Sequence, residues 1–286
     1  MTNILPNKNS LKYSGARSVS DVELIDFINN VPSKVPNTIE FLQDYKQWID
    51  STHTIAGWKN FNHLCFSNGT TESFDKFYHR YPHRRLRLLK GEYVYHQIIG
   101  KKIFKEFDWI EDVATLQHND VVAISLPFAD TGNVPLNLYA ILDRCEELKI
   151  PVLLDLAYIN LTVGLDLNLD YKCIDTITSS LSKVFPVSQH RIGIRLQQEF
   201  VDDTLIAYNQ NEYINLYSAG IGHEVINKYS ADYSFKKYRA QQLTLCKELS
   251  ITPSSSFIFG VDSDNLYPEY NRGSDSNRLC LSNYYF

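Results

Sequence analysis

The sequence has no long run of apolar residues and no strong charge of either sign. Its longest apolar runs are only a few residues, far below the roughly 20 that a membrane-spanning helix needs. The formal net charge is −5, which gives no general reason to expect binding to nucleic acid or to an anionic membrane. The first six residues lack a basic stretch followed by an apolar one, so we expect a cytoplasmic protein without a secretory leader.

Patterns that form disulfides or metal sites are also missing. The eight histidines are dispersed, and no two flank a Glu at the spacing of a zinc-binding helix. The cysteines are odd in number, widely spaced and contain no C-x-x-C pair. They are Cys65, Cys145, Cys173, Cys246 and Cys280. We therefore expect reduced, packed thiols and no metal centre.

The composition is that of an ordinary folded chain. With 44% hydrophobic and 21% charged residues among 286, the chain is close to the averages for soluble globular proteins. This composition, with 12 Gly and 10 Pro, excludes a natively unfolded regulator, and there is no repeat and no low-complexity tract. The length allows one large domain with a smaller one beside it.

Short apolar runs alternate with amphipathic segments between about residues 60 and 200. A helix is predicted over residues 138–148, before Pro151, and two others begin near residues 20 and 38. This alternation is typical of an α/β fold with a mostly parallel sheet sandwiched by helices. The predicted strands are residues 63–66, 86–89, 121–125, 152–155, 174–178 and 191–196.

The chain after about residue 200 has a different pattern. Helical stretches continue through Leu249, and short strands are predicted at residues 257–259 and 279–281. We expect a large domain over residues 40–205. Residues 1–39 and 206–286 would then form a reduced α+β small domain.

Polar and charged residues gather after the ends of the predicted strands. In open parallel sheets, ligands bind beyond the carboxyl ends of the strands, so these residues are candidates for one binding site. Arg191 opens the last strand of the region. The others are Asn68, Gly69, Thr70, Asp155, Tyr158, Ser180 and Lys183.

This set resembles the pyridoxal-phosphate enzymes of fold type I, particularly the class I/II aminotransferases. The matching stretches are Ser67-Asn-Gly-Thr-Thr-Glu72, Asp155-Leu-Ala-Tyr158, Ser180-Leu-Ser-Lys183, Arg191-Ile-Gly and, near the end, Arg278-Leu-Cys-Leu-Ser282. They occur in the family's order, and the similarity covers about residues 38–282. The joint match is far more specific than any single stretch.

The resemblance implies an aminotransferase that moves an amino group between an amino acid and a 2-oxo acid. Lys183 would form the Schiff base with pyridoxal 5'-phosphate and move protons. Asp155 would favour the protonated ring nitrogen, and Tyr158 would bond the ring's phenolic oxygen. In this family the active site lies at a dimer interface, so a homodimer is implied.

The remaining implied roles concern the phosphate, the ring face and the substrate. Tyr93, with Tyr95 as a nearby rival, would stack on the cofactor ring, and Arg278 would hold the substrate carboxylate. The phosphate would bind backbone N–H groups at a helix start together with hydroxyl and cationic groups. These groups belong to Asn68, Gly69, Thr70, Ser180 and Arg191.

Two departures from the family pattern keep other functions open. The family's Asn-Pro-Thr-Gly loop appears here as Ala129-Asp-Thr-Gly132, and only eight residues follow Arg278. Either Asp130 or Tyr158 alone would replace the missing amide, or the electronics of the cofactor would differ. The alternatives are another pyridoxal-phosphate reaction, such as decarboxylation, β-elimination or a specialised biosynthetic step, and a non-catalytic relative that only binds.

A basic segment at residues 79–87 interleaves arginine, histidine and aromatic residues. Such a segment could form a nucleic-acid or phosphate patch. It follows a predicted helix, where basic residues suit the helix C-terminus, and the whole chain is acidic. We therefore favour an ordinary helix end, and expect no nucleic-acid partner.

Overall fold

The computed structural model describes residues 15–32 and 35–285. The segment on which we based the leader and localisation expectations, and part of the predicted small domain, lie outside these residues. Two helices come first, α1 (Val22–Asn30) and α2 (Thr38–Asp50). The N-cap of α1 is Asp21, which accepts hydrogen bonds from the Glu23 and Leu24 N–H groups, one residue after the predicted start near residue 20.

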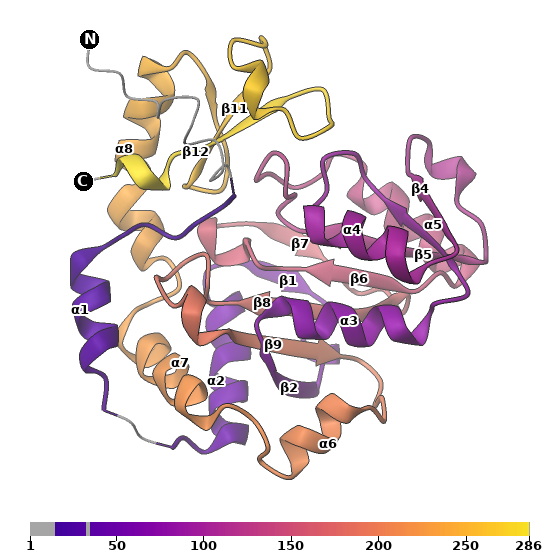
Figure 1. The fold of residues 1–286 in the computed structure, drawn as a ribbon, viewed down its shortest axis with the longest axis horizontal. Helices are drawn as coiled ribbons and strands as arrows, with labels where there is room; N and C mark the ends of the chain where they lie inside the picture. The colour runs from indigo at the N-terminus through magenta and orange to yellow at the C-terminus, as the bar shows by residue number, and fades with distance from the viewer. Residues whose placement is uncertain (1–14, 33–34, 286) are drawn as a thin grey trace.

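The centre of the molecule is a seven-stranded sheet in the order β2-β9-β8-β6-β5-β3-β4 (Figure 1). Only β9 runs against its neighbours, and all other pairs are parallel. The mostly parallel α/β sheet is therefore confirmed, although β4 was not predicted. The strands are β2 (His63–Asn68), β3 (Arg85–Leu88), β4 (Glu106–Trp109), β5 (Asp120–Ser125), β6 (Val152–Asp155), β8 (Ile174–Ser180) and β9 (Ile192–Gln197).

Helices cover both faces of this sheet, because alternate residues of its central strands are apolar on both sides. On one face Val121 and Ala123 pack in a cluster with Phe74 of α3 (Thr70–Arg80). On the other, Val122 and Ile124 join the main core. The other helices are α4 (Val94–Ile103), α5 (Leu138–Leu148), α6 (Thr204–Gln210), α7 (Leu216–Lys228), which packs on α2, and α8 (Tyr233–Glu248).

A small antiparallel sheet lies beside α8, at the top of Figure 1. It consists of β10 (Thr252–Pro253), β11 (Phe259–Asp262) and β12 (Asn277–Cys280). The two strands predicted here are present but displaced: β11 begins two residues later than expected, and β12 begins two residues earlier. A parallel pair, β1 (Thr54–Ala56) with β7 (Asp166–Asn168), was not predicted.

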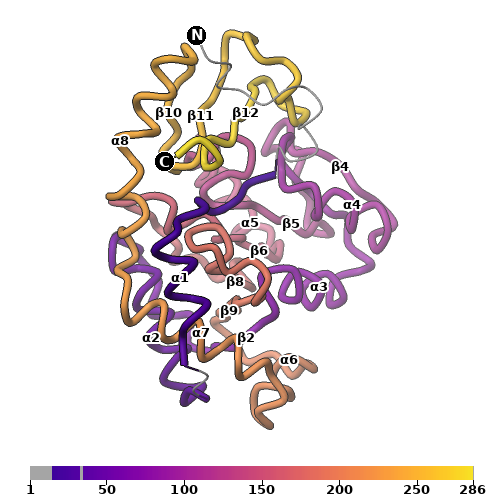
Figure 2. The backbone as a smooth tube through the Cα atoms, turned by 60° about the vertical axis from the view of Figure 1, so that its left-hand side comes forward, coloured from indigo at the N-terminus to yellow at the C-terminus, as the bar shows by residue number. Residues whose placement is uncertain are grey.

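The loop after β5 connects the large sheet to the small one. Ser256 N donates to Gly132 O (3.1 Å), and Ser255 N donates to the Asn133 side-chain oxygen (2.7 Å). Gly132 has φ +68°, and a Cβ there would lie 2.5 Å from Ser254 Oγ, so only glycine fits. Figure 2 shows the indigo segment before α1 passing between the two sheets. Both segments therefore border the carboxyl ends of the central strands.

The basic segment at residues 79–87 forms ion pairs within the fold. Arg80 pairs with Asp175. Arg85 Nε lies 2.7 Å from the Asp120 carboxylate, and the buried Arg87 guanidinium lies 3.2 Å from it. Arg80 ends α3, as the predicted helix end implies, whereas Arg85 and Arg87 lie in β3 and are held by internal ion pairs that were not predicted.

The described residues contain no helix long and apolar enough to cross a membrane. Within the same residues, no group of three or more His, Cys, Asp or Glu side chains is arranged to hold a metal ion. All five cysteines are free thiols.

Replacing Asp120 with Ala is expected to lower the free energy of unfolding by about 3–5 kcal/mol, because it leaves the buried Arg87 charge without its partner. Urea denaturation measures the change. Asp26→Ala removes an exposed carboxylate of α1 and is expected to change the same quantity by less than about 0.5 kcal/mol. Equal effects of the two substitutions would contradict the importance of this ion pair.

Candidate active site

A cavity of about 90 Å³ lies at the carboxyl ends of β5, β6 and β8. Most of the residues predicted for the cofactor line it, namely Thr70, Tyr93, Asp155, Tyr158, Ser180, Lys183 and Arg191. Asn68, Gly69 and Arg278 do not line it. The remaining lining residues are Thr71, Ser125, Ala129, Ala157, Ser182 and Ser188, which were not predicted.

Asp155 is the last residue of β6 and is 5% exposed. One carboxylate oxygen accepts a hydrogen bond from Ala157 N (3.0 Å), and no other described residue donates to this group. Burial raises the pKa of Asp155 to about 7, and the neighbouring Glu92 adds to the increase. A buried carboxylate with an unused oxygen facing a cavity is suited to bind a cationic N–H group.

Lys183 follows β8 in a tight turn. Its Nζ donates to the carbonyl oxygen of Ala16 (2.8 Å), so the segment before α1 passes directly over the amine. Burial lowers the pKa of Lys183. A lowered pKa raises the fraction of neutral amine, which is the form that attacks a carbonyl carbon.

Thr70 and Arg191 form a compact cationic end of the cavity, and Gly69 packs against the Arg191 guanidinium. Gly69 is the N-cap of α3, with φ +71°. Arg191 immediately precedes β9 in the left-handed region (φ +56°) rather than opening the strand as predicted. Its Nη2 donates to Asn68 O (3.2 Å) and Thr71 Oγ1 (3.0 Å).

Close packing maintains this cationic end. A Cβ on Gly193 would lie 2.7 Å from the Gly69 carbonyl carbon, and a Cβ on Gly69 would clash with the Arg191 guanidinium. The N–H groups at the start of α3, the hydroxyls and the guanidinium together form a donor set suited to a phosphate. Asn68 instead faces outward, where its side chain donates to Glu72 (3.1 Å).

Of the predicted aromatic residues, Tyr93 and Tyr158 line the cavity and Tyr95 does not. Tyr93, the N-cap of α4, lines the cavity, whereas the Tyr95 hydroxyl donates to Asp75 of α3 (2.6 Å). Tyr158 lines the cavity, and burial raises its pKa. Asp130, the other candidate to replace the missing amide, is fully buried and accepts from Ser274 in the loop between β11 and β12.

Two groups near the cavity were not found from the sequence. Glu92 is fully buried and accepts from Ser125 N (2.9 Å), the Ser125 hydroxyl and Tyr93 N (2.7 Å). Arg272 comes from the loop between β11 and β12 and lies 3.6 Å from Asp130. No motif marked either residue, but Ser125 ends a predicted strand and could have been found by that rule.

Arg278 is buried on β12, next to the cavity rather than in its lining. Its Nη1 donates to the Ala129 carbonyl, and its guanidinium lies 4.4 Å from the centre of the Phe259 ring. Its charge acts on both Tyr158 and Lys183, opposing the rise in the pKa of Tyr158 and adding to the decrease in that of Lys183. Arg278 is therefore adjacent to the predicted catalytic groups.

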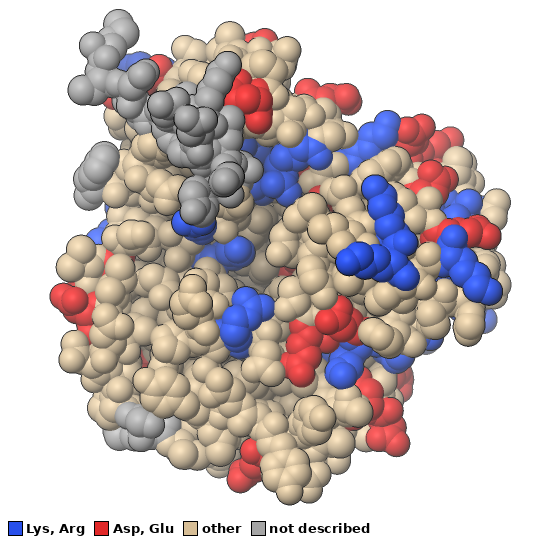
Figure 3. Space-filling view, viewed as in Figure 1, with Lys and Arg blue, Asp and Glu red and all other residues tan. Residues whose placement is uncertain are grey.

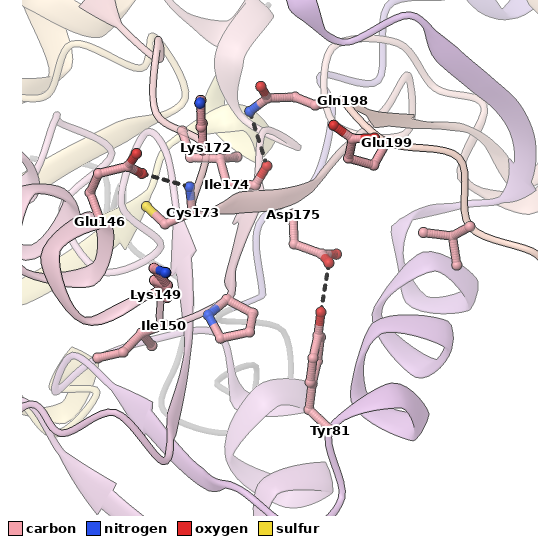
Figure 4. Close-up of a pocket in the computed structure, with 12 residues that line it drawn as sticks. Tyr81, Glu146, Lys149, Ile150, Lys172, Cys173, Ile174, Asp175, Gln198 and Glu199 are labelled. Carbon is pink, nitrogen blue, oxygen red and sulfur yellow. Dashed lines mark hydrogen bonds between the residues drawn. The ribbon is translucent and has the colours of Figure 1, made fainter.

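A larger cavity of about 360 Å³ lies at the opposite edge of the sheet (Figure 4). Several of its polar groups already form hydrogen bonds within the fold. The Tyr81 hydroxyl donates to Asp175 (2.7 Å), and Cys173 N donates to Glu146 (2.7 Å). Because these groups are paired, we assign the chemistry to the smaller cavity.

Asp155→Asn is expected to change how the stability of the cofactor-free protein depends on pH. With a folded pKa of about 7 against an ordinary 3.8, the folded chain keeps this proton while the unfolded chain loses it. Stability therefore falls as the pH rises from 4 to 7, by up to about 4 kcal/mol. Urea denaturation should find Asp155→Asn similar to the parent at pH 4 and more stable at pH 8.

The exposed Asp166→Asn substitution on β7 is the control for this experiment. It should leave the stability difference between pH 4 and pH 8 unchanged. If the free energy of unfolding of Asp155→Asn instead equals that of the parent at both pH values, the Asp155 carboxylate is not desolvated as the geometry requires.

No protein-family model matches this chain, and a search of curated proteins finds no match. Solved structures do match it closely in fold. A tetra mutant of Thermus thermophilus aspartate aminotransferase superposes with a TM-score of 0.70 at 12% identity, over 94% of this chain and 91% of that one. A Pyrococcus horikoshii aromatic aminotransferase gives 0.67 at 11% identity, over 94% and 90%.

A pyridoxal-phosphate-bound C-S lyase from Staphylococcus hominis is equally similar. It gives a TM-score of 0.69 at 11% identity, over 99% of this chain and 87% of that one. Enzymes with different reactions therefore match equally well, so the comparisons define the architecture. The chain has the aminotransferase-like fold of fold type I pyridoxal-phosphate-dependent enzymes.

Proposed function

We propose that this protein is a pyridoxal-phosphate-dependent aminotransferase that moves an amino group between an amino acid and a 2-oxo acid. The observation that carries the proposal is that Lys183, Asp155, Thr70 and Arg191 all line one cavity at the carboxyl ends of the parallel strands. Residues 40–205 would supply the cofactor site. Residues 1–39 and 206–286 would supply the part of the site that contacts the substrate.

The residues present fit the cofactor. Arg191, Thr70 and the N–H groups at the start of α3 would hold the phosphate, and Tyr93 would lie against the ring. The free oxygen of Asp155 would accept from the ring nitrogen. Once bound, the cofactor supplies an electron sink for the bond that breaks at the substrate α-carbon.

The protein groups have distinct tasks in this reaction. Asp155 must ionise to pair with a protonated ring nitrogen, and that pairing offsets the cost of its burial. Lys183 would hold the cofactor through its Nζ, and the same amine would carry a proton to or from the substrate α-carbon. The Tyr158 hydroxyl is free to bond the ring oxygen, in place of the missing amide.

Substrate binding and assembly are further parts of the proposal. Arg278 would hold the substrate α-carboxylate. The segment over Lys183 would have to release the amine when the cofactor binds, because Ala16 O now accepts from it. We further propose that the protein is a homodimer and works on small molecules in the cytoplasm.

β-Elimination on the same cofactor is the second candidate. One observation favours it: the Asp130 loop departs from the aminotransferase pattern. Incubation with amino acids that carry a leaving group on the β-carbon, followed by assay for 2-oxo acid and ammonia, separates it from amino-group transfer.

The core of the proposal is tested by trapping the cofactor on the chain. After addition of pyridoxal phosphate and reduction with borohydride, mass spectrometry should find one covalent adduct, on Lys183. Lys183→Ala should lose the adduct and the visible absorbance, whereas Lys172→Ala, at the opposite edge of the sheet, should keep both. A chain that never takes up the cofactor would refute the proposal.

Asp155→Asn should separate binding from turnover. The amide cannot stabilise a protonated ring nitrogen, so amino-group transfer is expected to fall by at least about 100-fold. The same variant should still form the borohydride-trapped adduct on Lys183. Unchanged turnover would show that Asp155 does not tune the ring.

A further inference from the structure

Arg272 is a largely buried guanidinium that donates no hydrogen bond to any described residue. Its side chain is only 19% exposed, and its Nε is buried without a hydrogen-bond partner. A buried guanidinium with unused donors is costly, because its lost hydration is not replaced. Such a group is suited to a ligand that supplies the missing acceptors.

The nearest carboxylate does not fill this role. Asp130 Oδ1 lies 3.6 Å from Arg272 Nε, beyond hydrogen-bonding distance, and makes no hydrogen bond. Asp130 Oδ2 already accepts from Ser274 and Ser276. Asp130 therefore neutralises part of the charge nearby, but leaves the forked face of the guanidinium without acceptors.

Arg272 lies beside the proposed active site. Asp130 is in contact with the chain at Gly91, since a Cβ there would lie 2.7 Å from Asp130 Cγ, and Tyr93 follows two residues later. The charge of Arg272 also opposes the rise in the pKa of Tyr158 and of Tyr93. Asp130, which Arg272 approaches to 3.6 Å, directly follows Ala129, a lining residue of the cavity.

The surface around the site carries positive charge, which suits an anionic ligand. Figure 3 shows Lys and Arg side chains around a hollow below the small sheet, on a chain whose net charge is −5. Arg272 lies beside Asp130 and Arg278 donates to the carbonyl of the preceding residue, Ala129, so both guanidinium groups contact the same loop, and their positive charges disfavour each other. Two positive charges that are held close together attract an anionic ligand.

We propose that Arg272 binds a second carboxylate, in the side chain of the substrate. This inference rests on the proposed function, in which Arg278 holds the α-carboxylate. The preferred substrates are then acidic amino acids and 2-oxo diacids. Arg is the side chain best suited to this task, because its fork binds a carboxylate bidentately.

Calorimetric titration with succinate and butyrate tests the inference, since these ligands share a four-carbon chain and differ in one carboxylate. The parent protein, loaded with pyridoxal phosphate, should bind succinate at least about 10-fold more tightly. Arg272→Gln should weaken succinate binding by about 10- to 100-fold, the range for hydrogen bonds to charged groups. It should leave butyrate binding within about twofold. The succinate affinity of Arg272→Lys should lie between those of the parent and of Arg272→Gln.

Arg144→Gln, an exposed arginine on α5 paired with Glu147, is the matched control and should change neither affinity. No preference of the parent for succinate, or an equal effect of Arg272→Gln on both ligands, would overturn the inference. The borohydride-trapped adduct on Lys183 keeps the two proposals distinguishable. Normal adduct formation without an Arg272 effect contradicts only this inference, whereas an Arg272-dependent preference in a protein that takes up no cofactor contradicts only the proposed function.

Discussion

The site depends on the hydrogen-bonded register of β6 between β5 and β8. This register pairs Asp155 with Ser125 on one side and with Thr178 on the other. The ladder continues past the strand ends, where Leu126 N donates to Asp155 O (2.9 Å) and Leu156 N donates to Thr178 O (2.7 Å). Because every residue of β5 and β6 is buried, a slip of one residue would exchange side chains between two closely packed faces and disrupt the packing of both. The Asp155 carboxylate is therefore held rigidly at the edge of the sheet.

A second constraint is the connection between the two sheets. The loop after β5 supplies Ala129 to the cavity and Asp130 to the loop that carries Arg272. Glu92 supports the same loop through Ser125. The Ser125 hydroxyl donates to Glu92 and also accepts a hydrogen bond from Ala129 N (2.9 Å). The groups that we propose for the cofactor ring and for the substrate are thus linked through one short chain of hydrogen bonds. The departure from the family's Asn-Pro-Thr-Gly sequence occurs within this linked segment.

The sequence predicted the parts of the fold that depend on local pattern. Strand β6 and helix α5 were found because their apolar periods are clear, and the lining residues Asp155, Ser180 and Lys183 followed from the rule for parallel strand ends. Strand β4 was missed because charged residues alternate with its aromatic ones, and β1 was missed because it has only three residues. Glu92 and Arg272 were missed because their positions depend on contacts between distant segments. The proposed domain boundaries and the roles of the site residues remain predictions.

The central claim is that one cavity holds pyridoxal phosphate between Lys183, Asp155 and the start of α3. A crystal structure of the protein grown with pyridoxal phosphate tests it most directly. We expect electron density continuous with Lys183 Nζ, the ring nitrogen against the Asp155 carboxylate, and the phosphate beside Thr70 and Arg191. Cofactor density attached elsewhere, with Asp155 and Lys183 facing only water, would contradict the account.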